Sequence, residues 1–118
     1  MPNIKESRIA VLSLARLKNN LGLMYLRQGR LGEARKMLKE ALHPLVEVLG
    51  NENSEILTIK NNLAGICIGE KKFHEAEKLH KEILAIRRKT LGKKHIDVAQ
   101  SLSNLALLFS QADSFFQN

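Results

Sequence analysis

A repeat of 42 residues constrains the fold of this chain more than any other feature of its sequence. Asn19-Asn20-Leu21-Gly22 recurs as Asn61-Asn62-Leu63-Ala64 and again as Ser103-Asn104-Leu105-Ala106. Glu33-Ala34 and Leu49-Gly50 recur at the same spacing as Glu75-Ala76 and Leu91-Gly92. Repeats of this length stack into arrays, because one unit cannot bury its apolar face alone. The pattern therefore predicts an array of about 2.5 units, an architecture that usually binds other proteins.

Each repeat holds two stretches with the three- and four-residue apolar spacing of a helix. The predicted helices span residues 3–28, 31–49, about 54–69, 72–91 and 95 to about 111. We expect Asn3 and Glu6 to form a capping box, Asn53 or Ser54 to cap the third helix, and His95 or a neighbour to start the fifth. Gly29 ends the first helix, and Gly50 is predicted to end the second in the left-handed conformation.

Small residues recur on both helices of the repeat, at Gly22, Ala64 and Ala106 on the first and at Ala34 and Ala76 on the second. Small side chains let two helix backbones approach closely, as a stacked helical hairpin requires. The sequence thus predicts an all-α array of antiparallel hairpins in a single domain, 1–118. Repeat 1 covers about 14–52, repeat 2 about 53–94 and a partial repeat 3 about 95–118.

Composition limits the class of protein and suggests the charge of its partners. The chain has a net charge of +7 and one cysteine, so it cannot form an intramolecular disulfide. No signal peptide and no run of about 18 apolar residues is present, so we expect a cytoplasmic protein without a membrane span. Basic residues gather in 1–30 and 71–94. They suggest acidic partners, but for 71–94 the favoured explanation is that lysines and arginines simply solvate the outer helix faces.

These residues resemble the tetratricopeptide repeat, and the long period resembles its kinesin light chain-like subclass. The first helix of the tetratricopeptide repeat carries a Leu-Gly or Leu-Ala pair, followed three positions after the small residue by an aromatic residue. The corresponding residues here are Leu21-Gly22 with Tyr25, Leu63-Ala64 with Cys67, and Leu105-Ala106 with Phe109. Lys60–Ala64, Lys71–Glu77 and Leu91–Ala99 match three further motifs of that subclass, with Ile96 in place of its proline. The resemblance covers about 14–111. It implies a right-handed superhelix and a non-catalytic adaptor that binds a partner's peptide in a concave groove.

The groove residues follow from this resemblance, in which the first helix of each repeat lines the concave face. Asparagine is a poor helix former, so the repeated Asn pairs call for an explanation. An Asn amide both donates and accepts hydrogen bonds and can hold a peptide backbone; the alternative is that these side chains only bond or pack within the array. The candidate peptide-binding residues are Arg16, Asn19, Asn20, Leu23, Arg27, Thr58, Asn61, Asn62, Gln100, Ser103 and Asn104.

The sequence contains no catalytic constellation, and we expect no enzyme activity, metal or cofactor. Its four histidines lack metal-ligand spacing, and Cys67 lies on an apolar helix face as a buried, inert thiol. His80 aligns with Leu38, so a packing role is expected for it. The basic segments leave nucleic-acid binding as a third and less favoured function, because few aromatic residues accompany them.

The C-terminal edge leaves the arrangement of the array open. The third repeat stops where its second helix should begin, and Phe109, Phe115 and Phe116 would then form an exposed apolar edge. Three arrangements fit: the chain is part of a longer array, its tail folds back as a cap, or two chains cover each other's edges. The alternative function is therefore an assembly module that docks through this edge onto further repeats or a second chain, including a second copy.

Overall fold

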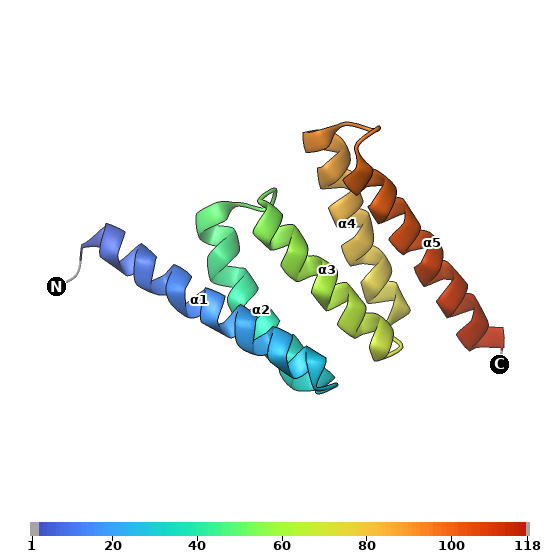
Figure 1. Cartoon of the computed structure of the whole chain (residues 1–118), viewed down its shortest axis with the longest axis horizontal. Coiled ribbons are helices and arrows are strands. Elements are labelled where there is room, and N and C mark those ends of the chain that lie inside the picture. The colour runs from blue at the N-terminus through green and yellow to red at the C-terminus, as the bar shows by residue number, and fades with distance from the viewer. Residues whose placement is uncertain (1–2, 118) are drawn as a thin grey trace. The chain divides into compact units, whose positions relative to one another are not determined.

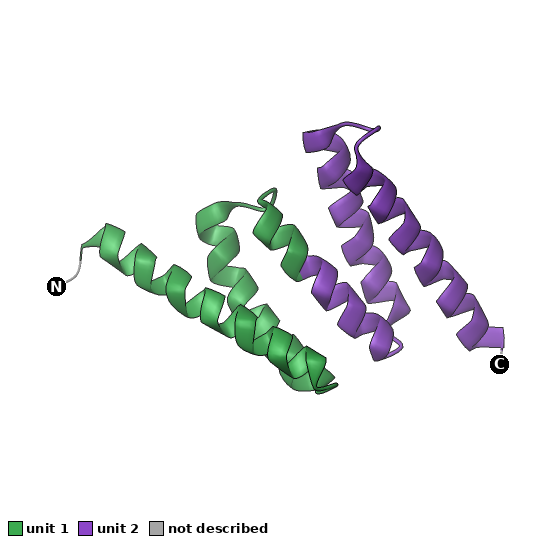
Figure 2. Ribbon diagram, viewed as in Figure 1, with its two compact units in different colours: residues 1–59 green, residues 60–118 purple. Residues whose placement is uncertain are grey.

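The computed structural model describes residues 3–117, which form five α-helices and no strand (Figure 1). The all-α prediction is confirmed. The helices are α1 (Ile4–Arg27), α2 (Leu31–Leu49), α3 (Ser54–Gly69), α4 (Phe73–Leu91) and α5 (Ile96–Gln117). The chain divides into two compact units, Met1–Ile59 and Lys60–Asn118, whose boundary lies within α3 (Figure 2).

In unit 1, both ends of α1 form as the sequence predicts. The backbone N–H of Glu6 donates to Asn3 Oδ1 at 2.8 Å, and that of Asn3 donates to Glu6 Oε2 at 3.2 Å, which completes the capping box. At the other end Gly29 has a φ of +75°. Arg30 N–H bonds the Tyr25 carbonyl at 2.9 Å and Gly29 N–H bonds the Leu26 carbonyl at 3.0 Å. These two bonds form a Schellman motif, which turns the chain into α2.

The contact between α1 and α2 depends on a glycine. A Cβ at Gly22 would lie 2.9 Å from Leu38 Cδ2 and 3.3 Å from the Ala34 carbonyl oxygen. Ala34 and Leu38 are fully buried. The predicted close approach at Gly22 and Ala34 is therefore confirmed, because any larger residue at position 22 would push the two helices apart.

Gly50 and Gly92, which follow α2 and α4, differ from the predicted left-handed termination. Their φ values are +84° and +88°, but their ψ values are 161° and 158°, so both are extended rather than left-handed helical. This region of backbone conformation is essentially restricted to glycine. The sequence identified the need for glycine correctly, and the geometry predicted for Gly50 was wrong. Each glycine still donates its N–H to the carbonyl four residues earlier.

The starts of α3 and α5 are capped by side chains, as predicted. Asn53 Oδ1 accepts the backbone N–H of Glu55 at 2.8 Å. His95 Nδ1 accepts the backbone N–H of Asp97 at 3.0 Å. Each cap satisfies an N–H group that has no partner within the first turn of its helix.

The core of unit 2 joins the end of α3, α4 and α5. Its cluster contains Ala64, Cys67, Phe73, Ala76, Leu84, Val98, Leu105 and Leu108. Cys67 is buried, as predicted, with its Sγ 3.7 Å from Glu75 Oε2. The buried hydroxyl of Ser101 accepts a bond of 2.8 Å from Arg87 Nη1. The mostly apolar cluster and this one satisfied polar group fix α4 against α5.

Helix α5 is longer than predicted. It continues past Gln111 to Gln117, whereas α1 ends at Arg27 and α3 at Gly69, which are the repeat equivalents of Gln111. The chain has no glycine near 113 to turn it. The extra turns also gain aromatic contacts, because the Phe73 ring lies 5.5 Å from that of Phe115 and 6.1 Å from that of Phe116.

The predicted packing role of the small residue in the third repeat was wrong. Ala64 is fully buried, but its equivalent Ala106 is exposed. In repeats 1 and 2 a following helix packs on this position. Among the described residues, no helix follows α5 to do the same.

Candidate functional site

Unit 2 contains a small hollow on the side of the repeat that the sequence assigned to peptide binding. Its volume is about 190 Å³. It is lined by residues of α3 and α5, and one residue of α4, which are Asn61, Gly65, Ile68, His80, Asn104, Leu107 and Gln111. We call this the polar hollow. Asn61, Gly65 and Ile68 are spaced so that they lie in one row along α3. A second row on α5, which lines the same hollow, contains Asn104, Leu107 and Gln111.

Three amide side chains form a hydrogen-bonded chain along the polar hollow. Gln100 Nε2 donates to Asn104 Oδ1 at 3.0 Å. Asn104 Nδ2 in turn lies 3.5 Å from Asn61 Oδ1, a long hydrogen bond. These bonds use the carbonyl of each Asn and one N–H of Asn104. The NH2 group of Asn61 takes no part in these two hydrogen bonds, so it can donate to the carbonyl of a bound peptide.

A bare helix surface forms one wall of the polar hollow. A Cβ added at Gly65 would meet nothing within 4 Å. Glycine is unfavourable in a helix interior by about 1 kcal/mol relative to alanine, and packing does not require it here. Gly65 therefore contrasts with Gly22, where a neighbouring helix excludes any side chain. Its effect is to leave space in the wall of the hollow.

The polar hollow is close to neutral. Its lining includes no lysine, arginine, aspartate or glutamate. Burial, with a smaller contribution from nearby Arg87, lowers the pKa of His80 from its usual value of 6.5. His80 is thus uncharged at neutral pH. The hollow suits an uncharged side chain or a peptide backbone better than an acidic group.

In unit 1, the side chains of two predicted peptide-binding residues already bond other residues of the same unit. Arg16 forms an ion pair of 3.0 Å with Glu55. Thr58 Oγ1 donates to the Ser54 carbonyl at 3.0 Å. Both side chains therefore have partners, which makes them weaker candidates for contact with a peptide than the sequence suggested.

The other predicted residues differ in their exposure. Asn20, Arg27 and Ser103 are exposed, and Leu23 and Asn62 are half-buried. Asn19 Oδ1 is buried and has no hydrogen-bond partner among residues 3–117. The structure brings Asn61, Gln100 and Asn104 together and leaves Asn62 and Ser103 outside the lining of the polar hollow.

Ile68 and His80 also line the polar hollow, although sequence reasoning did not assign them to the site. Ile68 follows Asn61 and Gly65 at helical steps of four and three, so the row containing Asn61, not Asn62, was the signal that could have identified it. His80 comes from a different helix, and only the packing of α4 reveals its position. Among residues 3–117, no three His, Cys, Asp or Glu side chains cluster as metal ligands would, and no helix is long and apolar enough to cross a membrane.

Comparison with known proteins establishes the family. Residues 14–55 and 55–115 each match a sequence profile described as tetratricopeptide repeat. The chain belongs to the tetratricopeptide repeat family. Comparison with curated protein sequences gives no significant match. Proteins of this family are in general non-catalytic scaffolds for protein–protein interaction.

A solved structure has a similar fold. The crystal structure of BtubC (BKLC) from P. vanneervenii superposes with a TM-score of 0.73 at 24% sequence identity. The match covers 86% of this tetratricopeptide repeat chain and 41% of BtubC. At this identity the likeness concerns the fold alone, and the kinesin light chain-like subclass stays a prediction.

Proposed function

We propose that this tetratricopeptide repeat chain is a non-catalytic adaptor that binds a peptide segment of a partner protein at the polar hollow. The observation that carries the proposal is the Asn61–Asn104 pair beside the bare surface of Gly65. Amide groups held together at the edge of an open space provide hydrogen bonds, and the missing side chain at position 65 provides room. Family membership supports a protein partner rather than a small substrate.

The arrangement suggests how a segment would be held. The NH2 group of Asn61 would donate to a backbone carbonyl, because Asn61 Oδ1 already accepts from Asn104. Such bonds do not depend on the sequence of the peptide. An uncharged side chain of the segment would enter the hollow beside Leu107 and Ile68. The basic segment 71–94 would favour acidic residues outside the hollow.

The one cysteine of the chain is consistent with a reducing compartment. Cys67 is a buried free thiol. We propose a reducing compartment, the cytoplasm, because structural disulfides persist mainly in oxidising ones.

Fluorescence provides a direct test of peptide binding, since the chain has no tryptophan. The probes are short peptides with one Trp flanked by acidic residues, titrated with the full chain. We expect a saturable blue shift of Trp emission. Asn104→Ala removes the side chain that holds the amide of Asn61 in place, so it should weaken binding by about 2- to 10-fold, which is about the contribution of one hydrogen bond.

Ser103→Ala is the matched control for this titration. Ser103 is exposed, adjoins Asn104 and does not line the polar hollow, so its removal should leave affinity unchanged. The proposal is wrong if no peptide shifts, or if Ser103→Ala and Asn104→Ala weaken binding equally while both variants stay folded by circular dichroism.

A second candidate function is assembly through the C-terminal edge, and one comparison favours it. Phe109 is 48% exposed, whereas its repeat equivalent Cys67 is 5% exposed. The alanine one turn earlier shows the same contrast between exposed Ala106 and buried Ala64. An apolar face that is covered in one repeat and open in the next suggests a surface for a partner helix.

A further inference from the structure

His80 differs from the other three histidines because no described residue is a polar partner of its ring. His43 Nδ1 lies 3.6 Å from Glu47 Oε1, and His95 Nδ1 accepts the backbone N–H of Asp97 at 3.0 Å. No group within residues 3–117 donates to the His80 ring, accepts from it or forms an ion pair with it. Yet His80 is only 5% exposed. A buried polar group without a partner is uncommon and calls for a physical explanation.

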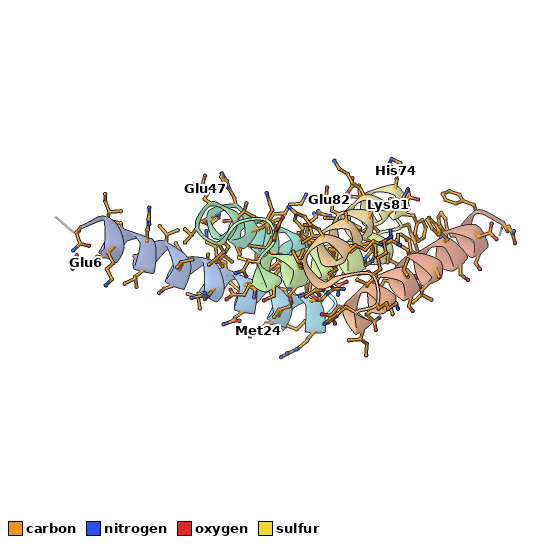
Figure 3. All side chains as sticks on the ribbon, turned by 90° about the horizontal axis from the view of Figure 1, so that it is seen from above. Glu6, Met24, Glu47, His74, Lys81 and Glu82 are labelled. Carbon is orange, nitrogen blue, oxygen red and sulfur yellow. The ribbon has the colours of Figure 1, made fainter. Side chains whose placement is uncertain are left out.

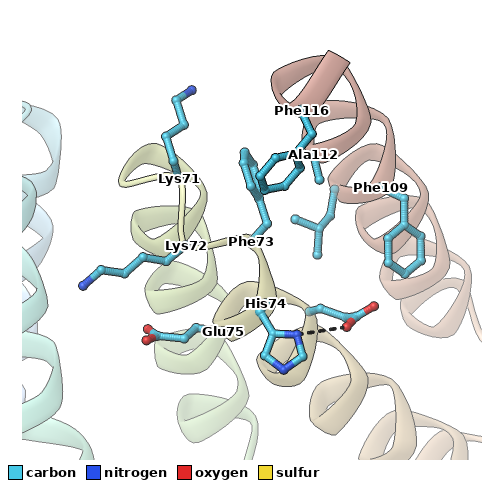
Figure 4. Close-up of a pocket in the computed structure, with 10 residues that line it drawn as sticks. Lys71, Lys72, Phe73, His74, Glu75, Phe109, Ala112 and Phe116 are labelled. Atoms are coloured by element: carbon cyan, nitrogen blue, oxygen red, sulfur yellow. Dashed lines mark ion pairs between the residues drawn. The ribbon is translucent and has the colours of Figure 1, made fainter. Parts of the chain in front are cut away.

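His74, on the same helix as His80, has the ordinary surroundings of a surface histidine. It lines a separate hollow of about 540 Å³ between the start of α4 and α5, and its Nδ1 lies 3.9 Å from Glu77 Oε2 (Figure 4). Figure 3 shows His74 on the outside of α4, and its side chain is 98% exposed. Six residues further along α4, His80 has neither this exposure nor a carboxylate beside it.

The ring nitrogens of His80 remain accessible although the residue is buried. Among the described residues, Asn19 Oδ1 is the one side-chain nitrogen or oxygen atom that is fully enclosed and lacks a hydrogen bond. The nitrogens of His80 also lack a hydrogen bond, so they are not fully enclosed. The open space that His80 lines is the polar hollow. His80 therefore offers hydrogen-bonding atoms to a group that enters this hollow.

Repeat 1 indicates that packing does not require a histidine at this position. The equivalent residue, Leu38, is fully buried. Gly65, which lines the same hollow, is likewise equivalent to a leucine, Leu23. Where repeat 1 has two leucines, repeat 2 thus has a polar ring and a residue without a side chain. Burial of an unbonded polar group is costly, and a bound group that bonds His80 would offset that cost.

The groups around His80 favour an uncharged ligand. The residues that line the polar hollow with it carry no charge and do not titrate, and they are Asn61, Gly65 and Ile68 of α3 and Asn104, Leu107 and Gln111 of α5. The charge that acts on His80 is that of Arg87, whose Nη1 donates to Ser101 Oγ at 2.8 Å and to the Asp97 carbonyl at 3.3 Å. Burial lowers the pKa of His80, so at pH 7 its ring is neutral, with one N–H donor and one acceptor.

We propose that His80 is a specificity-determining residue of the polar hollow, where its imidazole hydrogen-bonds a peptide side chain that ends in a hydroxyl. The inference rests on the proposed peptide binding at this hollow and adds which side chain enters it. A hydroxyl can donate to the ring or accept from it. Threonine fits best, because its methyl group also suits Ile68 and Leu107, the apolar residues of the lining.

Paired peptides that differ in one hydroxyl group test this proposal with the full chain. Each probe is a short peptide with one Trp flanked by acidic residues. Thr is placed in turn at each position near the Trp, and a partner peptide has Val at the same position. Trp emission measures both affinities. We expect one Thr peptide to bind about 2- to 10-fold more tightly than its Val partner, which is about the contribution of one hydrogen bond.

His80→Leu should remove the preference for Thr, because leucine offers the bound side chain no hydrogen bond. The substitution introduces the residue that repeat 1 buries at the equivalent position, Leu38. Leu84→Met is the matched control, since Leu84 is buried on the same helix but does not line the polar hollow, and it should keep the preference. Equal affinities for Thr and Val peptides in the wild type, or an unchanged preference in His80→Leu, would overturn the proposal.

The ring nitrogens give a second measurement that needs no variant of His80. In ¹⁵N NMR of the chain labelled at its histidine rings, His43→Gln, His74→Gln and His95→Asn each remove one signal set, so the remaining set belongs to His80. We expect the Thr peptide, and not its Val partner, to shift the ring nitrogens of His80. Equal shifts with both peptides would contradict a hydrogen bond to the hydroxyl.

Failure of this inference is distinguishable from failure of the proposed function. If no peptide of the set binds the wild type, peptide binding at the polar hollow fails and the role of His80 fails with it. If peptides bind and Asn104→Ala weakens them, but Thr and Val are equivalent, the assignment of His80 alone is wrong.

Discussion

Lys71 adopts the backbone conformation that Gly29 adopts one repeat earlier. Its φ is +63°, and the N–H groups of Lys71 and Lys72 bond the Ile68 and Cys67 carbonyls at 3.0 and 2.7 Å. These are the two bonds of the Schellman motif at Gly29. The repeat requires a left-handed residue at this position, and a lysine there carries a steric cost that glycine avoids.

Lys71→Gly should therefore stabilise the protein. We expect the free energy of unfolding to rise by about 0.5–1 kcal/mol, which is the left-handed penalty less the added flexibility of glycine. Urea denaturation measures the change. Lys93→Gly is the control, since Lys93 is also exposed but lacks a positive φ, and it should bring no gain. Equal effects of the two substitutions would show that Lys71 is not strained.

His80 should make stability depend on pH. Burial, and secondarily Arg87, lowers the pKa of His80 in the folded protein below its usual 6.5. The unfolded chain then binds the proton more tightly than the folded one. The full stability is present above about pH 6.5 and is lost as the pH falls below it towards the lower folded pKa. The free energy of unfolding should thus decrease between about pH 7 and pH 5.

The equivalent residue of repeat 1 suggests a substitution of His80 that tests this pH dependence. Leu38, its equivalent in repeat 1, is fully buried, so His80→Leu should fit the site and reduce the loss of stability between pH 7 and pH 5. Leu84→Met is the control, because it changes a buried side chain on the same helix without adding or removing a titratable group, so it should leave the slope unchanged. An unaltered slope in His80→Leu would exclude His80 as its source.

At the scale of the helix, two glycines within helices but in contrasting surroundings should respond in opposite ways to alanine. Gly65→Ala adds a Cβ that meets nothing within 4 Å, so it should raise the free energy of unfolding by about 1 kcal/mol. Gly22→Ala adds one 2.9 Å from Leu38, so it should lower stability by about 1–3 kcal/mol. Thermal or urea denaturation of both variants checks the pair. A stabilising Gly22→Ala would contradict the close approach of α1 and α2.

The last turns of α5 should depend on the aromatic cluster. Phe115 lies 5.5 Å from Phe73 and 5.1 Å from Phe116, and Lys71 Nζ lies 5.7 Å from its ring centre. Phe115→Ala should speed amide exchange in residues 113–117 and lower stability by about 1 kcal/mol. Leu107→Ala, at a position that lacks these aromatic contacts, should not change exchange there. Slow exchange in Phe115→Ala would mean that the helix extension does not need the cluster.

Helix boundaries were predictable where a local signal marks them. Asn3, Asn53 and His95 cap helices as the sequence predicts, and Gly29 ends α1. The end of α5 was not predictable in this way, because nothing in residues 111–117 resembles a helix terminator or reveals a contact with Phe73. The turn near residue 71 was predicted, but the positive φ of Lys71 was not, since only the register of the repeat, and not the residue type, points to it.

At the scale of the molecule, the 42-residue period was enough to predict the repeat fold. The family resemblance supplied the candidate site residues, of which Asn61, Gln100 and Asn104 are hydrogen-bonded together at the polar hollow. It did not predict that Asn61, instead of Asn62, would face the polar hollow. That choice depends on how α3 and α5 are rotated against α4, which is set by side-chain packing.

The central claim is that a partner peptide occupies the polar hollow, and backbone amide NMR of the ¹⁵N-labelled chain tests it most directly. The Trp peptide that binds best in the fluorescence titration would be added stepwise. We predict that the largest shift changes occur at Asn61, Gly65, Asn104 and Leu107, and that Gly65→Leu abolishes them by filling the space. Changes confined to Leu102, Phe109 and Phe116, or the absence of any change, would contradict peptide binding at the polar hollow.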